Sequence, residues 1–177
     1  WAQNYIPNPN RYYDNYGNKD DVNFYTKASY NITNKLNLFA DLQYRMVFYD
    51  ATSVKFDDVN DTFRFFNPKA GLNYQLNDKN AFYVYFGIAN KEPRRDDYES
   101  GAIKPERLFD YELGWKYNTK NVKLYANAFY MRYNDQLVMT GELNDVGSPV
   151  FTNSGKSYRL GLELEAKIKP IDKWILQ

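Results

Sequence analysis

The sequence predicts an all-β chain, an antiparallel up-and-down segment of a transmembrane β-barrel with about seven to eight strands. Short polar turns recur at residues 33–35, 77–79, 118–120 and 171–173, and their lysines are 44, 41 and 53 residues apart. Each interval fits two membrane-crossing strands of about 10 residues, one short connection and one long one. We therefore expect one edge of the sheet to carry short turns and the other to carry the long loops.

The composition also favours strands and turns. The 177 residues include 18 Tyr, 12 Phe, 3 Trp and 21 Asn. Aromatic residues suit half-buried pleated surfaces, and Asn suits turns. The mean hydropathy is −0.74, and no apolar run reaches the roughly 18 residues of a membrane helix. A barrel strand alternates lipid-facing with lumen-facing residues, so a modest mean hydropathy agrees with a barrel.

The absence of two residue types excludes several kinds of chemistry. The chain contains no Cys and no His, so it holds no disulfide, no Cys or His metal site, no Ser-His-Asp triad and no thiolate nucleophile. Its net charge of +1 produces no general attraction to nucleic acid. We expect a protein that is not an enzyme, with no cofactor and no nucleic-acid partner.

The first two strands should form a hairpin. Residues 1–20 are polar and without a period, which is typical of a loop. A strand over about 21–32 follows, and after the first turn a second strand runs from 36 to about 49. At about 3.3 Å per residue the second strand exceeds a hydrocarbon core of about 30 Å, so it should project from the membrane. Its outward apolar set is Leu36, Leu38, Ala40, Leu42, Tyr44 and Met46.

The middle of the chain repeats this plan. Residues 50–61 are expected to form a loop, followed by a strand over about 62–76. After the second turn, a strand over about 81–89 is apolar on both faces, so its orientation stays open. Residues 90–105 form the most charged loop. The apolar face of the strand over 62–76 is Ala70, Leu72, Tyr74 and Leu76.

Three further strands complete the pattern. One ends at the third turn and places Tyr111, Leu113, Trp115 and Tyr117 outward. The next begins near Val122 and continues to about 138. The clearest alternation covers 160–168, and a new strand begins after the last turn.

Aromatic residues gather at two levels along these strands. Such girdles mark the two interfaces of a membrane barrel, because amphipathic rings favour the headgroup level. The group beside the short turns is Tyr30, Tyr74, Tyr117 and Trp174, and the group toward the loops is Tyr44, Phe48, Phe66, Phe109, Tyr111 and Tyr130.

Several stretches, in this order, resemble the barrel of TonB-dependent outer-membrane receptors. Residues 41–45, Asp-Leu-Gln-Tyr-Arg, are similar to the version found in Bacteroidetes-type receptors. The other stretches are Phe66-Asn67-Pro68-Lys69-Ala70-Gly71-Leu72-Asn73-Tyr74, Phe82-Tyr83-Val84-Tyr85-Phe86-Gly87, Lys104-Pro105-Glu106, Tyr111-Glu112-Leu113-Gly114, Asn153-Ser154-Gly155-Lys156 and Gly161-Leu162-Glu163-Leu164.

This resemblance implies a 22-stranded barrel in the Gram-negative outer membrane, closed by an amino-terminal plug. Such a receptor imports a scarce ligand, for example a ferric siderophore, haem, cobalamin or a glycan, with energy from TonB. Residues 1–177 would be a partial barrel domain, about one third of the barrel, without the plug or the terminal strands. The implied partners are outer-membrane lipid, the plug of the same polypeptide, TonB and the imported ligand.

Two groups of residues are candidate sites. Arg94, Arg95, Asp96 and Tyr98 lie on the charged loop, where guanidinium groups suit an anionic ligand. The alternative is a solvated loop with local Arg–Asp pairs. The second group should point into the lumen, toward the plug or the transport path, or simply be the polar face of amphipathic strands: Arg45, Lys69, Glu112, Glu163 and Glu165.

Two weaker patterns and two other protein classes agree with parts of the sequence. Glu163 and Glu165 share one face, but nothing around them predicts paired-carboxylate catalysis. Asp57, Asp58 and Asp61 offer oxygen ligands for Ca²⁺ without the remaining features of an EF-hand. A small closed outer-membrane barrel with a structural or adhesive role, or a soluble β-sandwich binding module, would explain part of the alternation.

Overall fold

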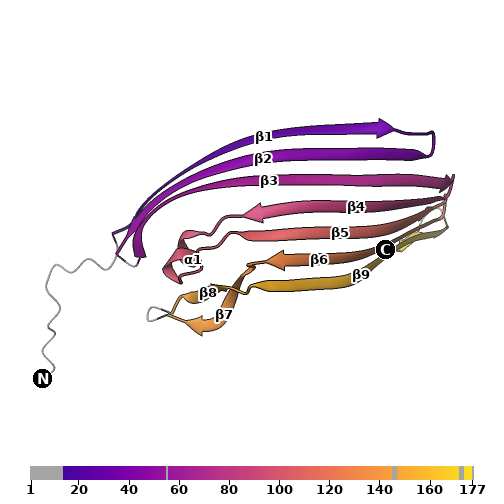
Figure 1. Cartoon of the computed structure of the whole chain (residues 1–177). Coiled ribbons are helices and arrows are strands. Elements are labelled where there is room, and N and C mark those ends of the chain that lie inside the picture. Colours follow the sequence, from indigo (N-terminus) through magenta and orange to yellow (C-terminus); the bar gives the residue numbers. More distant parts are fainter. Residues whose placement is uncertain (1–13, 55, 145–146, 172–173, 177) are drawn as a thin grey trace, which may run out of the picture.

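The computed structural model describes residues 14–54, 56–144, 147–171 and 174–176. Eight strands form one antiparallel sheet in the order β1-β2-β3-β4-β5-β6-β9-β10, and β7 and β8 pair separately (Figure 1). The elements are β1 Tyr16–Asn31, β2 Leu36–Ser53, β3 Phe56–Asn77, β4 Asn80–Lys91, α1 Arg95–Glu99, β5 Glu106–Asn118, β6 Val122–Asn134, β7 Leu137–Leu143, β8 Pro149–Asn153, β9 Lys156–Ile171 and β10 Trp174–Leu176.

The predicted short turns at 33–35, 77–79 and 118–120 are confirmed, and short polar side chains stabilise them. Thr33 Oγ1 accepts hydrogen bonds from the backbone N–H groups of Lys35 and Leu36. Asn77 Oδ1 does the same for the backbone N–H groups of Lys79 and Asn80. These contacts satisfy backbone donors that the turn leaves without strand partners. Of the fourth predicted turn, residues 172 and 173 lie outside the described part.

The prediction of loops at residues 16–20 and 50–61 is wrong. β1 already begins at Tyr16, and β2 and β3 extend as a hairpin to Ser53 and Phe56. Asp50 lies opposite Asn60, and the Asn60 amide donates to the Asp50 carboxylate over 2.6 Å. One face of this extension carries the Asp50–Asn60 pair, and α1 packs on the other face at Tyr49 and Phe56. Neither face lies against lipid, so the sequence lacks the regular apolar alternation that indicates a strand. The rest of the predicted loop 1–20, residues 1–13, lies outside the described residues.

The long strand predicted over 122–138 is also wrong, because β6 ends at Asn134. Asp135 adopts a positive φ of 51°, and its carbonyl accepts a hydrogen bond from the Asn153 amide. The chain therefore leaves the sheet, forms the β7–β8 hairpin and returns as β9, which pairs with β6. The charged loop 90–105 contains the short helix α1.

One face of the sheet is apolar and uncovered. Across seven strands, directly opposed residues form an apolar row, and its leucines are 36% to 65% exposed. A soluble β-sandwich would cover such a face with a second sheet, which the described residues do not contain. This is the lipid-facing surface, and strand β4 adds Phe82, Val84 and Phe86 to it. The row is Tyr30, Leu38, Leu72, Val84, Leu113, Ala128 and Leu162.

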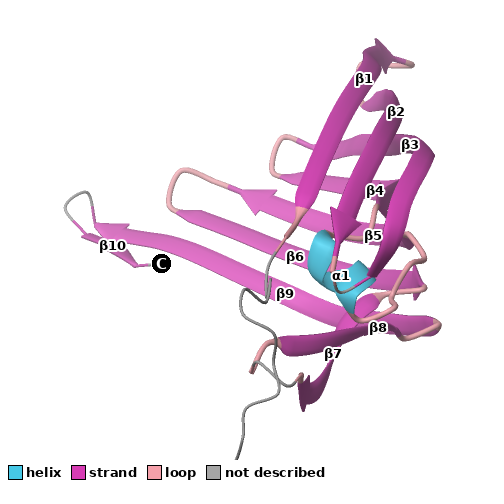
Figure 2. Ribbon diagram, turned by 90° about the vertical axis from the view of Figure 1, so that its left-hand side faces the viewer, coloured by secondary structure: helices cyan, strands magenta, loops and turns pink. Residues whose placement is uncertain are grey.

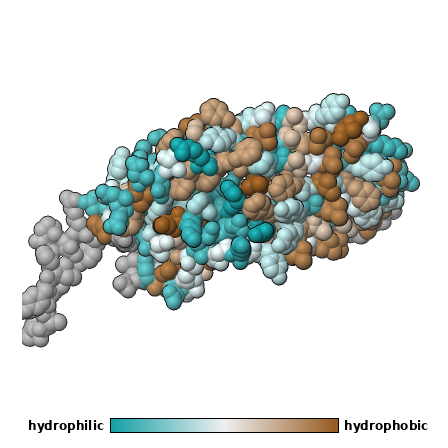
Figure 3. Space-filling model, in the orientation of Figure 1, coloured by the Kyte–Doolittle hydropathy of each residue, from teal (hydrophilic) through white to brown (hydrophobic). Residues whose placement is uncertain are grey.

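Aromatic residues border this apolar face at both ends. Toward the loops, Phe86, Tyr111, Tyr130 and Tyr158 form a chain of ring contacts with centroids 5.0 to 6.1 Å apart. Beside the short turns, Trp115 packs against Tyr117 at 6.1 Å. Apolar residues gather toward the short-turn end in the view of Figure 3. The prediction for Trp174 concerns a side chain outside the described part.

The sheet is curved but open. Its two edges are β1 and β10, and Figure 2 shows them far apart on either side of the hollow. The strands are therefore a segment of a larger barrel and not a small closed one. Among the described residues, no helix is long and apolar enough to cross a membrane.

Candidate functional site

The helix α1 lies on the hollow side of the sheet, at the end that carries the long connections (Figure 2). Asp97 is fully buried, and its carboxylate accepts a hydrogen bond from the Arg94 backbone N–H over 2.7 Å. This contact caps the first turn of the helix. Tyr98 is 7% exposed. Helix α1 is thus held close to the lumen side of the barrel mouth.

Tyr98 fastens this helix to β2 and β3. Its hydroxyl donates a hydrogen bond to Asp61, and its ring lies 5.6 Å from that of Tyr49 and 6.2 Å from that of Phe56. Burial, followed by the hydrogen bond to Asp61, raises the pKa of the Tyr98 phenol. The structure therefore places this predicted ligand-binding residue inside a packed contact between two connections.

The three charged candidates on this loop differ in their surroundings. Arg94 lies over the Phe151 ring at 5.3 Å and 3.5 Å from Asp97, so it links α1 to β8. Arg95 lies 3.6 Å from Asp96 and 3.4 Å from Glu99, yet its side chain stays 53% exposed. The side chain of Asp96 is 59% exposed. Arg95 and Asp96 thus present charge to solvent at the mouth.

Arg45 is the centre of an ion cluster below α1. Its guanidinium lies 2.8 Å from Glu92 and also binds Asp21, and the Lys19 ammonium binds the Glu92 Oε1 atom as well. Burial opposes ionisation of Glu92, whose side chain is 10% exposed, but hydrogen bonds from Arg45 and Lys19 outweigh it and lower the pKa to about 2. The cluster joins β1 and β2 to the segment that follows β4, so it anchors the base of the charged loop.

A second polar network lies on the lumen face, within the membrane-spanning part of the sheet. The Tyr83 hydroxyl contacts Tyr125 at 2.5 Å, Asn127 at 2.9 Å and Glu112 at 3.3 Å. The Asn127 amide donates to Glu112 over 3.2 Å and to Glu163 over 3.5 Å. Two of the predicted lumen residues, Glu112 and Glu163, are therefore brought together by a buried asparagine.

The other predicted lumen residues lie outside this network. Lys69 lies opposite Asp41 in the register of β2 and β3. Glu165 lies opposite Tyr125 and borders an open hollow of about 460 Å³ together with Lys116 and Lys123. Sequence reasoning missed Asp21, Glu92 and Tyr83, and only the alternation of β4 could have placed Tyr83 in the lumen.

Glycines accommodate the large rings on the lumen face. Phe39 lies opposite Gly71, Tyr83 opposite Gly114, and Phe129 opposite Gly161. At each glycine a Cβ atom would overlap the ring of that partner. Aromatic side chains that cover a cross-strand glycine fix the register of strand pairs. The lumen surface is therefore closely fitted across three separate strand pairs.

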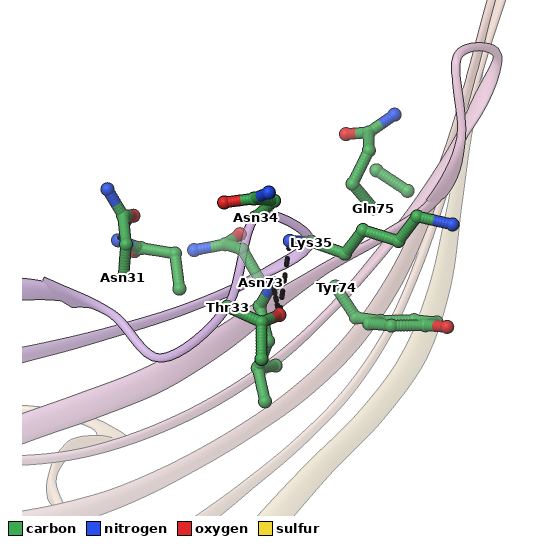
Figure 4. Close-up of a pocket in the computed structure, with 10 residues that line it drawn as sticks. Asn31, Thr33, Asn34, Lys35, Asn73, Tyr74 and Gln75 are labelled. Atoms are coloured by element: carbon green, nitrogen blue, oxygen red, sulfur yellow. Dashed lines mark hydrogen bonds between the residues drawn. The ribbon is translucent and has the colours of Figure 1, made fainter.

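Two other features of the described structure lack the properties of a binding site. A hollow of about 400 Å³ lies at the short-turn end (Figure 4), where the polar atoms of Thr33 are already engaged by the turn. Asp57 and Asp61 lie four residues apart on β3 and Asp58 lies on its opposite face, so the three carboxylates do not converge. The described residues hold no group of three metal-ligating side chains.

The chain is similar to known proteins over almost its whole length. The family description "TonB dependent receptor-like, beta-barrel" matches residues 2–176. The pesticin receptor of Yersinia enterocolitica is 38% identical over 69 residues, which are 39% of this chain and 10% of that receptor. The matched part of this chain therefore spans only about a tenth of the length of that curated relative.

Solved structures share the fold. The FrpB iron transporter from Neisseria meningitidis matches 89% of this chain and 25% of its own, with a TM-score of 0.67 and 22% identity. The copper transporter OprC matches 90% of this chain and 28% of its own, with a TM-score of 0.77 and 15% identity. The described sheet corresponds to about a quarter of each of these proteins.

Proposed function

This chain belongs to the TonB-dependent receptors of the Gram-negative outer membrane, and on that premise we propose that the intact receptor imports a scarce ligand with energy delivered through TonB. The family consists of receptors and transporters, and the chain carries no Cys or His for catalysis. We accordingly assign it no enzymatic role. Residues 1–177 contribute to the barrel domain, and a plug of the same polypeptide occupies its lumen.

The ligand class that we favour is a ferric siderophore, ahead of haem, cobalamin or a glycan. The observation that supports this choice is that the structural neighbours include a ferric-catecholate import receptor and a ferric yersiniabactin uptake receptor. The exposed Arg95 at the mouth supports it, because guanidinium groups bind anionic oxygen ligands in pairs of hydrogen bonds. Arg94 and Tyr98 hold the loop that presents Arg95 and Asp96.

The lumen-facing residues have a different proposed role. Glu163 and Glu165 are exposed on the lumen side of β9, so they are available to cationic groups of the plug. Lys69 and Glu112 line the same face nearer the centre of the sheet. Arg45 acts indirectly, since its guanidinium is already engaged by Asp21 and Glu92. A double-mutant cycle between Glu163 and basic plug residues tests this contact.

Uptake measurements test the main proposal. The chromosomal receptor gene is deleted, and the gene is supplied on a plasmid. These cells are given radiolabelled iron as a catecholate complex, a hydroxamate complex or haem, and, separately, labelled cobalamin. We expect one iron complex to enter in a receptor-dependent way and its entry to stop in cells without TonB. Receptor-dependent entry that persists without TonB would contradict the proposal, as would entry of none of the probes.

A variant pair tests the role of the loop. Arg94→Ala with Arg95→Ala should weaken binding of the transported iron complex about tenfold, because the cationic contact of Arg95 is lost and the loop that presents it loses the support of Arg94. Lys35→Ala with Lys79→Ala removes the same charge at the short-turn end and should leave binding unchanged. Equal affinity of both variants and the wild-type receptor at physiological salt would remove this loop from the binding site.

A further inference from the structure

The outward face of strands β5, β6 and β9 carries charge at only one level. Along these strands the outward positions are apolar, aromatic or uncharged, except for Arg107, Arg132 and Lys156 at the loop end. The carboxylates of the same strands all lie on the lumen face: Glu106, Asp110, Glu112, Glu163 and Glu165. The lumen face of these strands carries charges of both signs, whereas the charges on the outward face are all positive and all at the loop end.

The three cations form a compact group. Arg132 lies opposite Phe109 on β5 and opposite Tyr158 on β9, two residues from Arg107 and from Lys156 respectively. Arg107 and Lys156 are thus both diagonal neighbours of Arg132, at Cα separations of about 7–8 Å. Long side chains at this spacing reach a common point. A single anionic group can therefore contact all three.

Their charges are available for such a group. All three residues are exposed, and within the described part of the chain none of them forms an ion pair. The Arg107 Nε atom donates to the Asn90 amide oxygen over 2.9 Å, which orients the guanidinium. Arg64 on β3 and Arg107 border a hollow of about 310 Å³ beside the group. Uncompensated cations at this density favour an anionic partner.

The level of the group on the barrel identifies the partner. Tyr158 lies level with Arg132, and its ring neighbour Tyr130 lies with Tyr111 two residues further toward the membrane. The exposed leucines of the lipid face follow below them. Aromatic girdles mark the headgroup level, and the longer loops of outer-membrane barrels are extracellular. The cations therefore lie where the phosphates of the outer leaflet lie.

We propose that Arg107, Arg132 and Lys156 form a binding site for the phosphate of an anionic glycolipid of the outer leaflet, with the lipid chains on the apolar face beneath. Arg132 is the central contact, and Arg107 and Lys156 flank the phosphate. Arginine suits this role because its planar guanidinium binds phosphate oxygens in pairs. Tyr158 packs beside the sugar–acyl junction.

The test uses the intact receptor, purified in detergent, and bisphosphorylated lipid A as the probe. Native mass spectrometry measures the affinity of the wild-type receptor and of two triple variants for this lipid. The first variant is Arg107→Gln/Arg132→Gln/Lys156→Gln. The second, the control, is Lys35→Gln/Lys79→Gln/Lys120→Gln, which loses the same charge in the short turns. We expect at least a tenfold loss for the first variant and none for the control. Dephosphorylated lipid A should bind the wild-type receptor as weakly as bisphosphorylated lipid A binds the variant.

Several results would overturn the proposal. These are equal affinity of the first variant and the wild type, equal affinity for phosphorylated and dephosphorylated lipid A, and full competition by inorganic phosphate at concentrations equal to that of the lipid. Heat-modifiable migration confirms that each variant is folded. If the triple variant does not assemble, Arg132→Gln alone should still lower the affinity at least threefold and Arg132→Lys should retain most of it, and a failure of either expectation rejects the site.

Discussion

At the scale of single residues, the lumen face depends on glycines that leave room for rings. Gly114 lies beneath Tyr83, whose hydroxyl is tied to Tyr125, Asn127 and Glu112. The ring therefore cannot move aside without breaking a buried network, and such networks are costly to leave partly satisfied. The tyrosine and the glycine are consequently one structural unit.

Gly114→Ala should lower the stability of the receptor by about 1–3 kcal/mol, the usual range for overpacking. Thermal unfolding in detergent measures this effect. Gly17→Ala is the matched control, because a Cβ there would meet only a backbone oxygen at 3.9 Å. Combining Gly114→Ala with Tyr83→Ala should cost less than the sum of the single changes. Additive costs would show that the ring and the glycine are independent.

Glu92 makes the stability of the folded receptor depend on pH through its contacts with Arg45 and Lys19. Although burial opposes ionisation, the hydrogen bonds from Arg45 and Lys19 lower the pKa of Glu92 from its ordinary 4.5 to about 2, so the folded state favours the ionised carboxylate by about 3 kcal/mol. Because the folded pKa is the lower one, this contribution is complete above about pH 4.5 and is lost as the pH falls toward 2. The Arg45 cluster should therefore stabilise the loop at neutral pH and release it in acid.

Glu92→Gln should be less stable than the wild-type receptor at pH 7, and the difference should shrink between pH 4.5 and 2. Unfolding by denaturant across that range measures the change. Glu142→Gln, on an exposed strand residue, serves as the control and should show little difference at any pH. A difference that stays constant down to pH 2 would show that ionisation of Glu92 does not support the cluster.

At the scale of elements, the parts of the fold that the membrane constrains were predictable. Lipid on one face and the lumen on the other impose a period of two, which located the spanning parts of β2, β3, β5 and β9. The extension of β2 and β3 beyond the membrane has no lipid on either face, since one face meets water and the other packs against α1. Polar residues such as Asp50 and Asn60 therefore looked like a loop. A five-residue helix is too short to show a period of 3.6.

The candidate site was predictable only in part, for a related reason. The alternation of polar and apolar residues placed Arg45 and Glu112 on the lumen side, because the face on which a side chain lies depends only on the residues beside it in the same strand. The partner of Arg45, Glu92, lies 47 residues further along the chain, and the contact exists because the segment after β4 folds inward. Similarly, charge on the loop suggested that Tyr98 binds ligand, whereas its burial follows from packing against β2 and β3.

The packing of α1 leads to a prediction at this scale. Tyr98→Phe removes the hydrogen bond to Asp61 while keeping the ring between Tyr49 and Phe56. Amide hydrogen exchange of residues 95–102 should become several-fold faster, while exchange in β5 and β6 stays unchanged. Tyr16→Phe, at an exposed position, is the control. Unchanged exchange over 95–102 would show that ring packing alone holds the helix.

At the scale of the whole molecule, the connections at the loop end behave as one assembly. Tyr98 joins α1 to the β2–β3 hairpin, Arg94 joins it to β8, and Asn153 exchanges hydrogen bonds with the backbone of Lys104. The sheet, in contrast, is not closed, because β1 and β10 are free edges in the described structure. The mouth is thus well supported within this segment, while the wall depends on further strands.

This open wall leads to the last prediction. In hydrocarbon every backbone N–H and C=O group needs a partner, and an unpaired strand edge has none. The isolated chain of residues 1–177 should therefore form no stable channel in planar lipid bilayers and show no heat-modifiable migration, whereas the intact receptor should show such migration. Reproducible channel conductance together with heat-modifiable migration of the isolated chain would mean that its two edges find partners, either by closing on each other or by assembling with further copies.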